Sequence, residues 1–179
     1  MSFLDTNFLG KISIILISSI FYFCENSLIN STVNDFFIPY NLLLANDSKL
    51  NYNSKGLLYY GNNPFSGYLV KKNMYDQITE KKGFFKGQLE GISLGYYDNG
   101  NKKYQRFYNK GEKTGKHIGW FESGQKKFEY FFKKGLSEEK HTQWYYNGMV
   151  YSEINYLNGK PFGSTKVWRK DGKLRSNFV

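Results

Sequence analysis

The side chains of this sequence best suited to chemistry are two histidines, His117 and His141, spaced 24 residues apart. A histidine pair holds a metal ion when a third ligand lies close by. Glu138 and Glu139 precede His141, but the only cysteine is the distant Cys24, and the sequence contains no HExxH motif, nucleophile elbow or strand-to-helix phosphate loop. We therefore expect no catalytic site, no metal site and no cofactor.

The histidine spacing belongs to a repeat that covers the C-terminal two thirds of the chain. Three columns recur every 24 residues: Gly87, Gly111, Gly135 and Gly159; Gly100, Gly124, Gly148 and Gly172; and Tyr96, Trp120, Trp144 and Trp168. A period of this length indicates a supersecondary unit stacked on copies of itself. The array spans residues 59–179, with units at 59–82, 83–106, 107–130, 131–154 and 155–178, of which the first is degenerate and is interpreted as a cap.

Each unit is predicted to form one β-hairpin. Asn99, Ser123, Asn147 and Asp171 precede the glycines of the Gly100 column, and such X-Gly dipeptides between aromatic runs are a strong hairpin signal. A second, wider polar turn, such as residues 109–115, is expected to join one hairpin to the next. Because the two histidines occupy the same place in consecutive hairpins, their backbones should lie about 9–10 Å apart, too far for a metal ion shared by the pair alone.

Alternation within the runs favours strands. Phe128, Tyr130 and Phe132 fall on one face at period 2, and the aromatic position recurs as Phe84, Tyr108, Phe132 and Tyr156, which predicts a packed stripe. On the other face, Glu129 and Glu153 have flanking lysines, so we expect cross-strand ion pairs there. The fold class is thus all-β, an elongated antiparallel meander of repeated hairpins whose end strands leave unpaired edges that invite a partner.

A fourth column runs through Gly67, Gly91, Gly115 and Gly163 and is broken by Glu139. We interpret these glycines as turn residues. The turn at Glu139 should therefore be looser or take a different conformation.

Several segments resemble the bacterial MORN-repeat variant, whose signatures are "YY-x-N-G" and "Y-x-x-G-x-x-x-G". They are 96–103, 145–148 and 156–163, and the stretch 58–67 is similar to the first strand of YwqK-type antitoxins of toxin–antitoxin systems. The resemblance covers about residues 59–179. It implies a non-enzymatic module that binds a protein partner, such as a toxin, in an antitoxin-like or immunity-like role. The name of the wider family suggests the alternative, a peripheral membrane or envelope scaffold.

Positive charge is concentrated in the repeats. Residues 1–55 carry three lysines and four acidic residues, whereas 56–179 carry 22 lysines and arginines and 11 acidic residues, which accounts for the net charge of +10. The cations recur in phase, and with the aromatic column they form the expected binding surface: Tyr96, Trp120, Trp144, Trp168, Lys102, Lys103, Lys126, Lys127 and Arg175. Such a ridge attracts anionic lipid, or it simply keeps an aromatic-rich sheet soluble. Nucleic acid is the least favoured partner because the aromatic residues are committed to packing.

The N-terminal part has a different character. Lys11 precedes a short apolar run from Ile12 to Cys24, which is typical of a secretory signal and shorter than the ~20 residues of a membrane-spanning helix. We therefore expect residues 1–24 to be a signal or an N-terminal hydrophobic helix, and the protein to be exported or associated with the cell envelope. The alternatives are lipidation at Cys24 and a cytoplasmic protein with a buried helix. Residues 25–58 are interpreted as a linker with a docking segment at 36–45.

Overall fold

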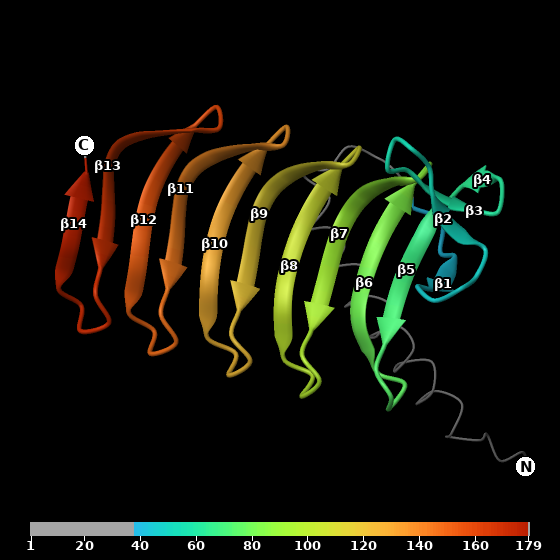
Figure 1. The fold of residues 1–179 in the computed structure, drawn as a ribbon, viewed down its shortest axis with the longest axis horizontal. Coiled ribbons are helices and arrows are strands. Elements are labelled where there is room, and N and C mark those ends of the chain that lie inside the picture. The colour runs from blue at the N-terminus through green and yellow to red at the C-terminus, as the bar shows by residue number, and fades with distance from the viewer. Residues whose placement is uncertain (1–37, 179) are drawn as a thin grey trace, which may run out of the picture. The chain divides into compact units, whose positions relative to one another are not determined.

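The computed structural model describes residues 38–178 of the 179-residue chain. These residues are all-β, as the repeat predicts, and form an eleven-stranded sheet with the order β1-β5-β6-β7-β8-β9-β10-β11-β12-β13-β14 and a three-stranded sheet with the order β2-β3-β4 (Figure 1). The predicted signal or hydrophobic helix at 1–24, with Cys24, and the first part of the predicted linker lie outside the described residues.

The strands follow one another along the chain. Their bounds are β1 Leu42–Leu44, β2 Leu50–Tyr52, β3 Leu58–Tyr60, β4 Asn63–Pro64, β5 Gly67–Lys72, β6 Ile78–Phe85, β7 Gln88–Tyr96, β8 Lys102–Asn109, β9 Glu112–Trp120, β10 Lys126–Lys133, β11 Leu136–Trp144, β12 Val150–Leu157, β13 Lys160–Trp168 and β14 Leu174–Phe178. From β5 to β14 every neighbouring pair is antiparallel and consecutive in sequence, which makes the meander. β1 is the exception, because it pairs with β5 in parallel.

Along one side of the large sheet, where strand ends meet, the hairpins are closed by tight two-residue turns at the Gly87 column (Figure 1). Asn109 pairs with Glu112, so only Lys110 and Gly111 make the turn, with φ of 49° and 82°. Two positive φ values identify a type I′ turn, whose twist matches that of the strands. The wider turn predicted for residues 109–115 is therefore wrong, because β9 already begins at Glu112.

The wider loops join the strands at their opposite ends. At the Gly100 column, the N–H of Gly100 donates to the carbonyl of Tyr97, and the N–H of Tyr97 donates to the carbonyl of Asn101, which encloses three loop residues. Within this loop only Gly100 has a positive φ, and the side chain of Asn99 accepts the N–H of Asn101 at 3.0 Å. The Asn-Gly dipeptide here thus ends a three-residue hairpin loop and does not form a two-residue turn.

The column of Gly91, Gly115, Glu139 and Gly163 lies within strands and not in turns. Gln105 pairs with Ile118 but Phe107 pairs with Thr114, so β9 carries extra residues opposite β8, and the same β-bulge recurs in β7, β11 and β13. Glu139 has a φ of 59°, close to the 61° of Gly115. The prediction of a different conformation at Glu139 is therefore wrong. Glu139 pairs with Tyr156 of β12 and keeps the backbone conformation of the glycines at this position.

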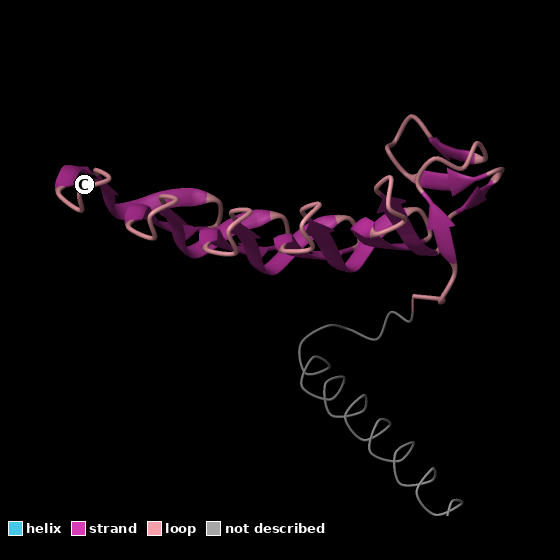
Figure 2. Ribbon diagram, turned by 90° about the horizontal axis from the view of Figure 1, so that it is seen from below, coloured by secondary structure: helices cyan, strands magenta, loops and turns pink. Residues whose placement is uncertain are grey.

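The N-terminal end of the large sheet is capped. Leu58, Phe65 and Phe84 form a buried cluster where the β2-β3-β4 sheet meets β6. Residues 42–52, within the predicted linker, form β1 and β2. Figure 2 shows the large sheet edge-on, and beyond this cap the described residues form a single layer. Most side chains of β8 to β12 are accordingly half-buried or exposed.

Candidate interaction surfaces

One face of the sheet carries a continuous row of rings, which we call the histidine row: Tyr108, His117, Phe132, His141 and Tyr156. Successive ring centroids lie 5.6, 4.7, 5.4 and 4.5 Å apart. Each ring comes from the next strand along the sheet, from β8 to β12. Three members of the predicted aromatic stripe therefore lie on one line, as expected, but histidines fill the places between them, which the sequence did not reveal.

Each histidine forms a hydrogen bond with a backbone carbonyl group opposite a bulge. In β8 and β10 the bulge opposite leaves carbonyl groups outside the regular ladder, and Nε2 of His117 lies 2.8 Å from the carbonyl oxygen of Phe107. His141 makes the same contact, also at 2.8 Å, with Phe131. Both side chains are buried, with exposed fractions of 2% and 8%.

This environment keeps the imidazoles neutral. Burial lowers the pKa of His117 and of His141, and the hydrogen bonds to the backbone carbonyls offset only part of the effect. Phe132 lies between the two imidazoles. Within residues 38–178 no three His, Cys, Asp or Glu side chains lie close enough to hold a metal ion. What the arrangement does chemically is to provide hydrogen-bond partners for two part-buried carbonyl oxygens.

The opposite face carries ion pairs that repeat from unit to unit. Lys116 lies 3.3 Å and Lys126 lies 2.7 Å from the carboxylate of Glu129, and Lys140 lies 3.0 Å from Glu153. The pairs Lys116–Glu129 and Lys140–Glu153 join neighbouring strands, which confirms the predicted cross-strand ion pairs, whereas Lys126 and Glu129 both belong to β10. Burial alone would raise the pKa of the Glu129 carboxyl, but the hydrogen bonds and charges of the two lysines lower it below its ordinary value.

The tryptophan column adjoins these ion pairs. Nζ of Lys126 lies 5.7 Å from the ring of Trp144, and Nζ of Lys102 lies 5.9 Å from the ring of Trp120. Both contacts have the geometry of a cation–π interaction. The structure thus places two of the predicted cations directly over two of the predicted aromatic residues, one unit apart. Tyr96 and Trp168 are likewise half-buried at the ends of β7 and β13.

The other predicted cations lie close to the wide loops. Lys103 lies 5.4 Å from the ring of Tyr97, and Lys127 lies 5.6 Å from the ring of Phe121, while Arg175 is exposed on β14. The hydroxyl of Tyr97 donates to the carbonyl of Trp120 at 2.8 Å. The same bond, from Tyr145 to Trp168, measures 2.9 Å. These hydroxyls link adjacent hairpins. The equivalent residue of the unit between them is Phe121, so the recurrence of tyrosine after two periods, at 97 and 145, was the only signal that could have revealed them.

The tight turns are linked to one another by hydrogen bonds. The N–H groups of Gly87, Gly111, Gly135 and Gly159 donate to the carbonyls of Phe65, Leu89, Lys113 and Ser137, at 2.7 to 2.9 Å. At three of these turns the residue before the glycine donates its N–H to a side chain of the previous unit: Lys86 to Ser66, Lys110 to Glu90 and Asn158 to Glu138. A Cβ would meet nothing within 4 Å at Gly100, Gly111, Gly124 and Gly148. What the glycines of both columns share is a positive φ, from 77° to 89°, which other residues rarely adopt. The predicted turn glycines are therefore structural.

Comparison with protein-family models, with characterised proteins and with solved structures returned no match. The resemblance to MORN-repeat variants thus stays a prediction from the segments named above. Over residues 38–178 no helix has the length and apolar character needed to cross a bilayer.

Proposed function

We propose that this chain is a non-enzymatic binding module that presents one face of its repeat sheet to another protein, in the antitoxin-like or immunity-like role that the resemblance implies. The observation that carries the proposal is the paired column of tryptophans and lysines. Trp120 and Trp144 are half-exposed, and each has a lysine over its ring. Tryptophan is among the residues that dominate the binding energy of protein interfaces.

The surroundings of these residues support an interface. Among the described residues no second layer covers this face (Figure 2), and the units repeat the same chemistry in phase. A flat surface with regularly spaced aromatic and cationic groups suits an extended partner surface better than a small molecule, which usually binds in a concave pocket. The ion pairs around Glu129 and Glu153 would then form a polar rim.

The test is cross-linking in the native host, followed by mass-spectrometric identification of the partner. The double variant Trp120→Ala/Trp144→Ala should reduce the yield of the cross-linked partner at least tenfold. The matched control is Tyr52→Ala, which also removes an exposed aromatic residue but lies in the cap. If the double variant folds and still captures the partner, the two tryptophans contribute to packing within the sheet and not to binding. Failure of the native chain to capture any stoichiometric protein would refute the proposal.

The second candidate function is a peripheral scaffold on anionic lipid. The observation that favours it is the exposure of Lys102, Lys103, Lys126 and Lys127, which recur at the same positions of consecutive units. Each lysine near a charged bilayer contributes about 1 kcal/mol to binding. The full-length chain should therefore sediment with vesicles containing phosphatidylserine at low salt and dissociate at high salt. Absence of binding at low salt would exclude this candidate.

A further inference from the structure

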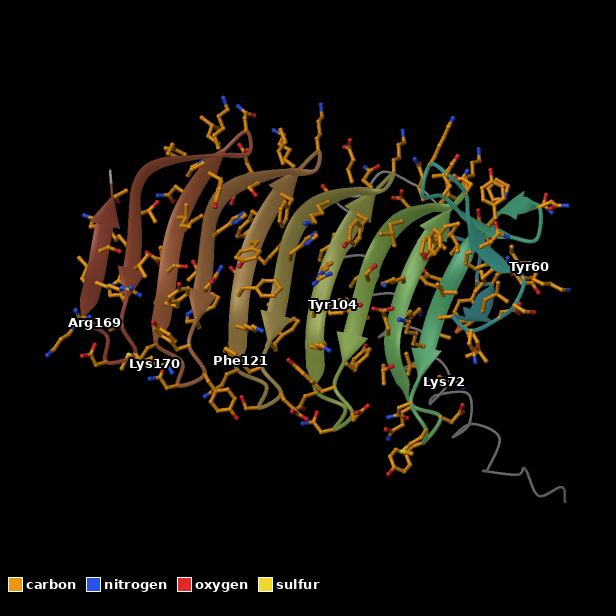
Figure 3. The ribbon with its side chains drawn as sticks, viewed as in Figure 1. Tyr60, Lys72, Tyr104, Phe121, Arg169 and Lys170 are labelled. Atoms are coloured by element: carbon orange, nitrogen blue, oxygen red, sulfur yellow. The ribbon has the colours of Figure 1, made fainter. Side chains whose placement is uncertain are left out.

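The positive charge of the array is concentrated in its last unit. Residues 155–178 contain six lysines and arginines and one acidic residue, whereas residues 131–154 contain three of each. We call the six the basic cluster: Lys160, Lys166, Arg169, Lys170, Lys173 and Arg175. All six are exposed, and Figure 3 shows Arg169 and Lys170 at the loop before β14.

Few acidic groups lie among these cations. Glu153 stands opposite Lys166 in the ladder, and the carboxylate of Asp171 accepts the backbone N–H of Lys173 at 3.0 Å. Lys71, Lys82, Lys116 and Lys140 each lie within 4.0 Å of a carboxylate. Within residues 38–178 no member of the basic cluster has an ion pair. Lys170 lies 6.0 Å from the ring of Tyr145, a contact that leaves its charge uncompensated. The last unit is therefore the part of the described sheet that most strongly attracts acidic groups.

The basic cluster adjoins a strand edge. In the described sheet β14 pairs only with β13, so alternate N–H and C=O groups of β14 point away from the sheet. Such an edge accepts an added strand, with backbone hydrogen bonds providing affinity and side chains providing specificity. A phosphodiester chain lacks the N–H groups that this edge would pair with.

The other edge shows how this sheet accommodates a short added segment. Three residues of β1 pair with β5 in parallel, from Leu42 opposite Tyr68 to Leu44 opposite Val70. The bonds continue on either side, since Tyr68 donates to Asn41 at 2.6 Å and Ala45 donates to Val70 at 2.8 Å. A three-residue strand thus covers that edge, and β14 offers five residues.

The last unit also exposes apolar side chains, one of them at a position that is polar or charged in the earlier units. Phe162 is 53% exposed and stands where Glu90 and Glu138 accept backbone N–H groups. Leu174 on β14 is 52% exposed, and Leu157 is 54% exposed. Apolar residues next to unpaired cations are typical of a contact surface for another protein.

We propose that the edge of β14 and the basic cluster bind an extended, acidic segment of a partner protein by strand addition. This inference rests on the proposed function and specifies the chemistry of the partner. A second copy of this chain is a poor occupant, because it would bring six further cations against the first six, and like charges facing each other oppose association.

The test uses a fluorescent ten-residue peptide of alternating glutamate and valine, and measures its binding to the full-length chain by anisotropy at 0.05 and 0.15 M salt. The same peptide with alternate residues N-methylated keeps its charge but lacks the N–H groups along one side. We expect binding of the first peptide, weakened by added salt, and at least tenfold weaker binding of the second. Equal affinity for the two peptides, or no binding of either at low salt, would overturn the proposal.

The protein variants locate the site. Lys166→Glu/Lys173→Glu/Arg175→Glu should weaken peptide binding at least tenfold, whereas Lys55→Glu/Lys86→Glu/Lys133→Glu, with the same change in net charge, should change it less than threefold. A second variant, Lys170→Glu/Lys173→Glu, changes only the loop before β14. It should weaken peptide binding severalfold, and it tests the site if the triple variant fails to fold. Equal losses in the cluster and control triples would overturn the proposal.

Rival occupants are tested in the same experiment. Tighter binding of a single-stranded oligonucleotide or of phosphatidylserine vesicles than of the peptide, lost on substitution of the cluster, would overturn the acidic-segment proposal. So would a dimer in light scattering that dissociates in the peptide's presence. In the cross-linking experiment in the host, the native chain is compared with Lys166→Glu/Lys173→Glu/Arg175→Glu. Equal capture of a partner by both would overturn this inference but leave the proposed function standing. Capture of no partner by either would instead refute the proposed function.

Discussion

Nε2 of His141 lies 2.8 Å from the carbonyl oxygen of Phe131, and His117 has the same relationship to Phe107 one unit earlier. In both cases the carbonyl stands opposite a bulge. Because each bulge interrupts the backbone ladder, a side chain has to replace the missing donor. The imidazole does this while its ring packs between aromatic rings of the neighbouring strands.

His141→Ala should therefore destabilise the sheet. Leaving the part-buried carbonyl of Phe131 without a hydrogen-bond partner costs about 1 kcal/mol, and the lost ring contacts with Phe132 and Tyr156 add to this. The free energy of unfolding can be measured by urea denaturation. Lys133→Ala, an exposed position in the same unit, serves as control. A loss no larger than that of the control would contradict this account.

Stability should also fall in mild acid. Burial holds the pKa values of His117 and His141 below 6.5 in the folded chain, so the unfolded chain takes up protons first as the pH falls. Stability should thus decline from about pH 6.5 toward the folded pKa values, by at most ~1.4 kcal/mol per pH unit for each histidine. His117→Gln/His141→Gln should flatten urea-derived stabilities between pH 7.5 and 5. An unchanged slope would argue against the histidines as its source.

A second decline should begin in stronger acid. Burial opposes ionisation of Glu80, but hydrogen bonds from Lys82 and Tyr104 and the charges of Lys82 and Lys71 lower the pKa of its carboxyl below 4.5. The pKa of Glu129 is lowered similarly. The stabilisation from a lowered carboxyl pKa is present above about pH 4.5 and is lost as the pH falls through the folded value. Glu129→Gln should reduce this acid-dependent loss in unfolding titrations below pH 4.5.

Lys134→Asn should stabilise the protein. Lys134 holds a φ of 49° in its type I′ turn, where the equivalent residue in the last hairpin is Asn158, with a φ of 50°. Asparagine tolerates this region better than lysine, so we expect a gain of up to about 1 kcal/mol. The increase in melting temperature should be absent in Lys133→Asn, which makes the same change one residue earlier. A loss in both variants would mean that the lysine side chain matters more than the turn.

Gly119→Ala should destabilise the array for a steric reason. The φ of Gly119 is not positive, but a Cβ there would collide with the ring of Phe128, its cross-strand partner. Overpacking of this kind costs about 1–3 kcal/mol. In the next unit the same two positions are Gln143 and Ser152. The cost should therefore shrink in a Phe128→Ser background, and a double-mutant cycle with zero coupling would exclude the collision.

The period and the alternation of residues were sufficient to predict the sheet, its antiparallel order and the shared face of Phe128, Tyr130 and Phe132. The turn types were not predictable in the same way. A Lys-Gly pair is a weak signal for a type I′ turn, while Asn-Gly also suits the end of a three-residue loop. The choice between them depends on strand register, which aromatic runs of similar length leave open.

The candidate surfaces were partly predictable. The columns of Trp120 and Lys102 were visible, but not their contact, because it joins residues 18 apart across a bulge-shifted ladder. The histidines could not be assigned from spacing alone, since their role depends on a carbonyl of the neighbouring strand. The conformation of Glu139 was not predictable for a similar reason. A glutamate can hold a positive φ when the ladder with the next strand fixes its backbone, here through the pairing of Glu139 with Tyr156, and sequence alone does not show that constraint.

The turn-to-turn hydrogen bonds, such as that from Gly111 to Leu89, always span 22 residues and always join a unit to its immediate predecessor. Excising or duplicating one complete 24-residue segment between equivalent turns would therefore leave each remaining junction chemically intact. An insertion of any other length would disrupt the hydrogen bonds between the two units that it separates. Sheet length in this protein is thus free to change by genetic duplication or loss, in steps of one whole hairpin.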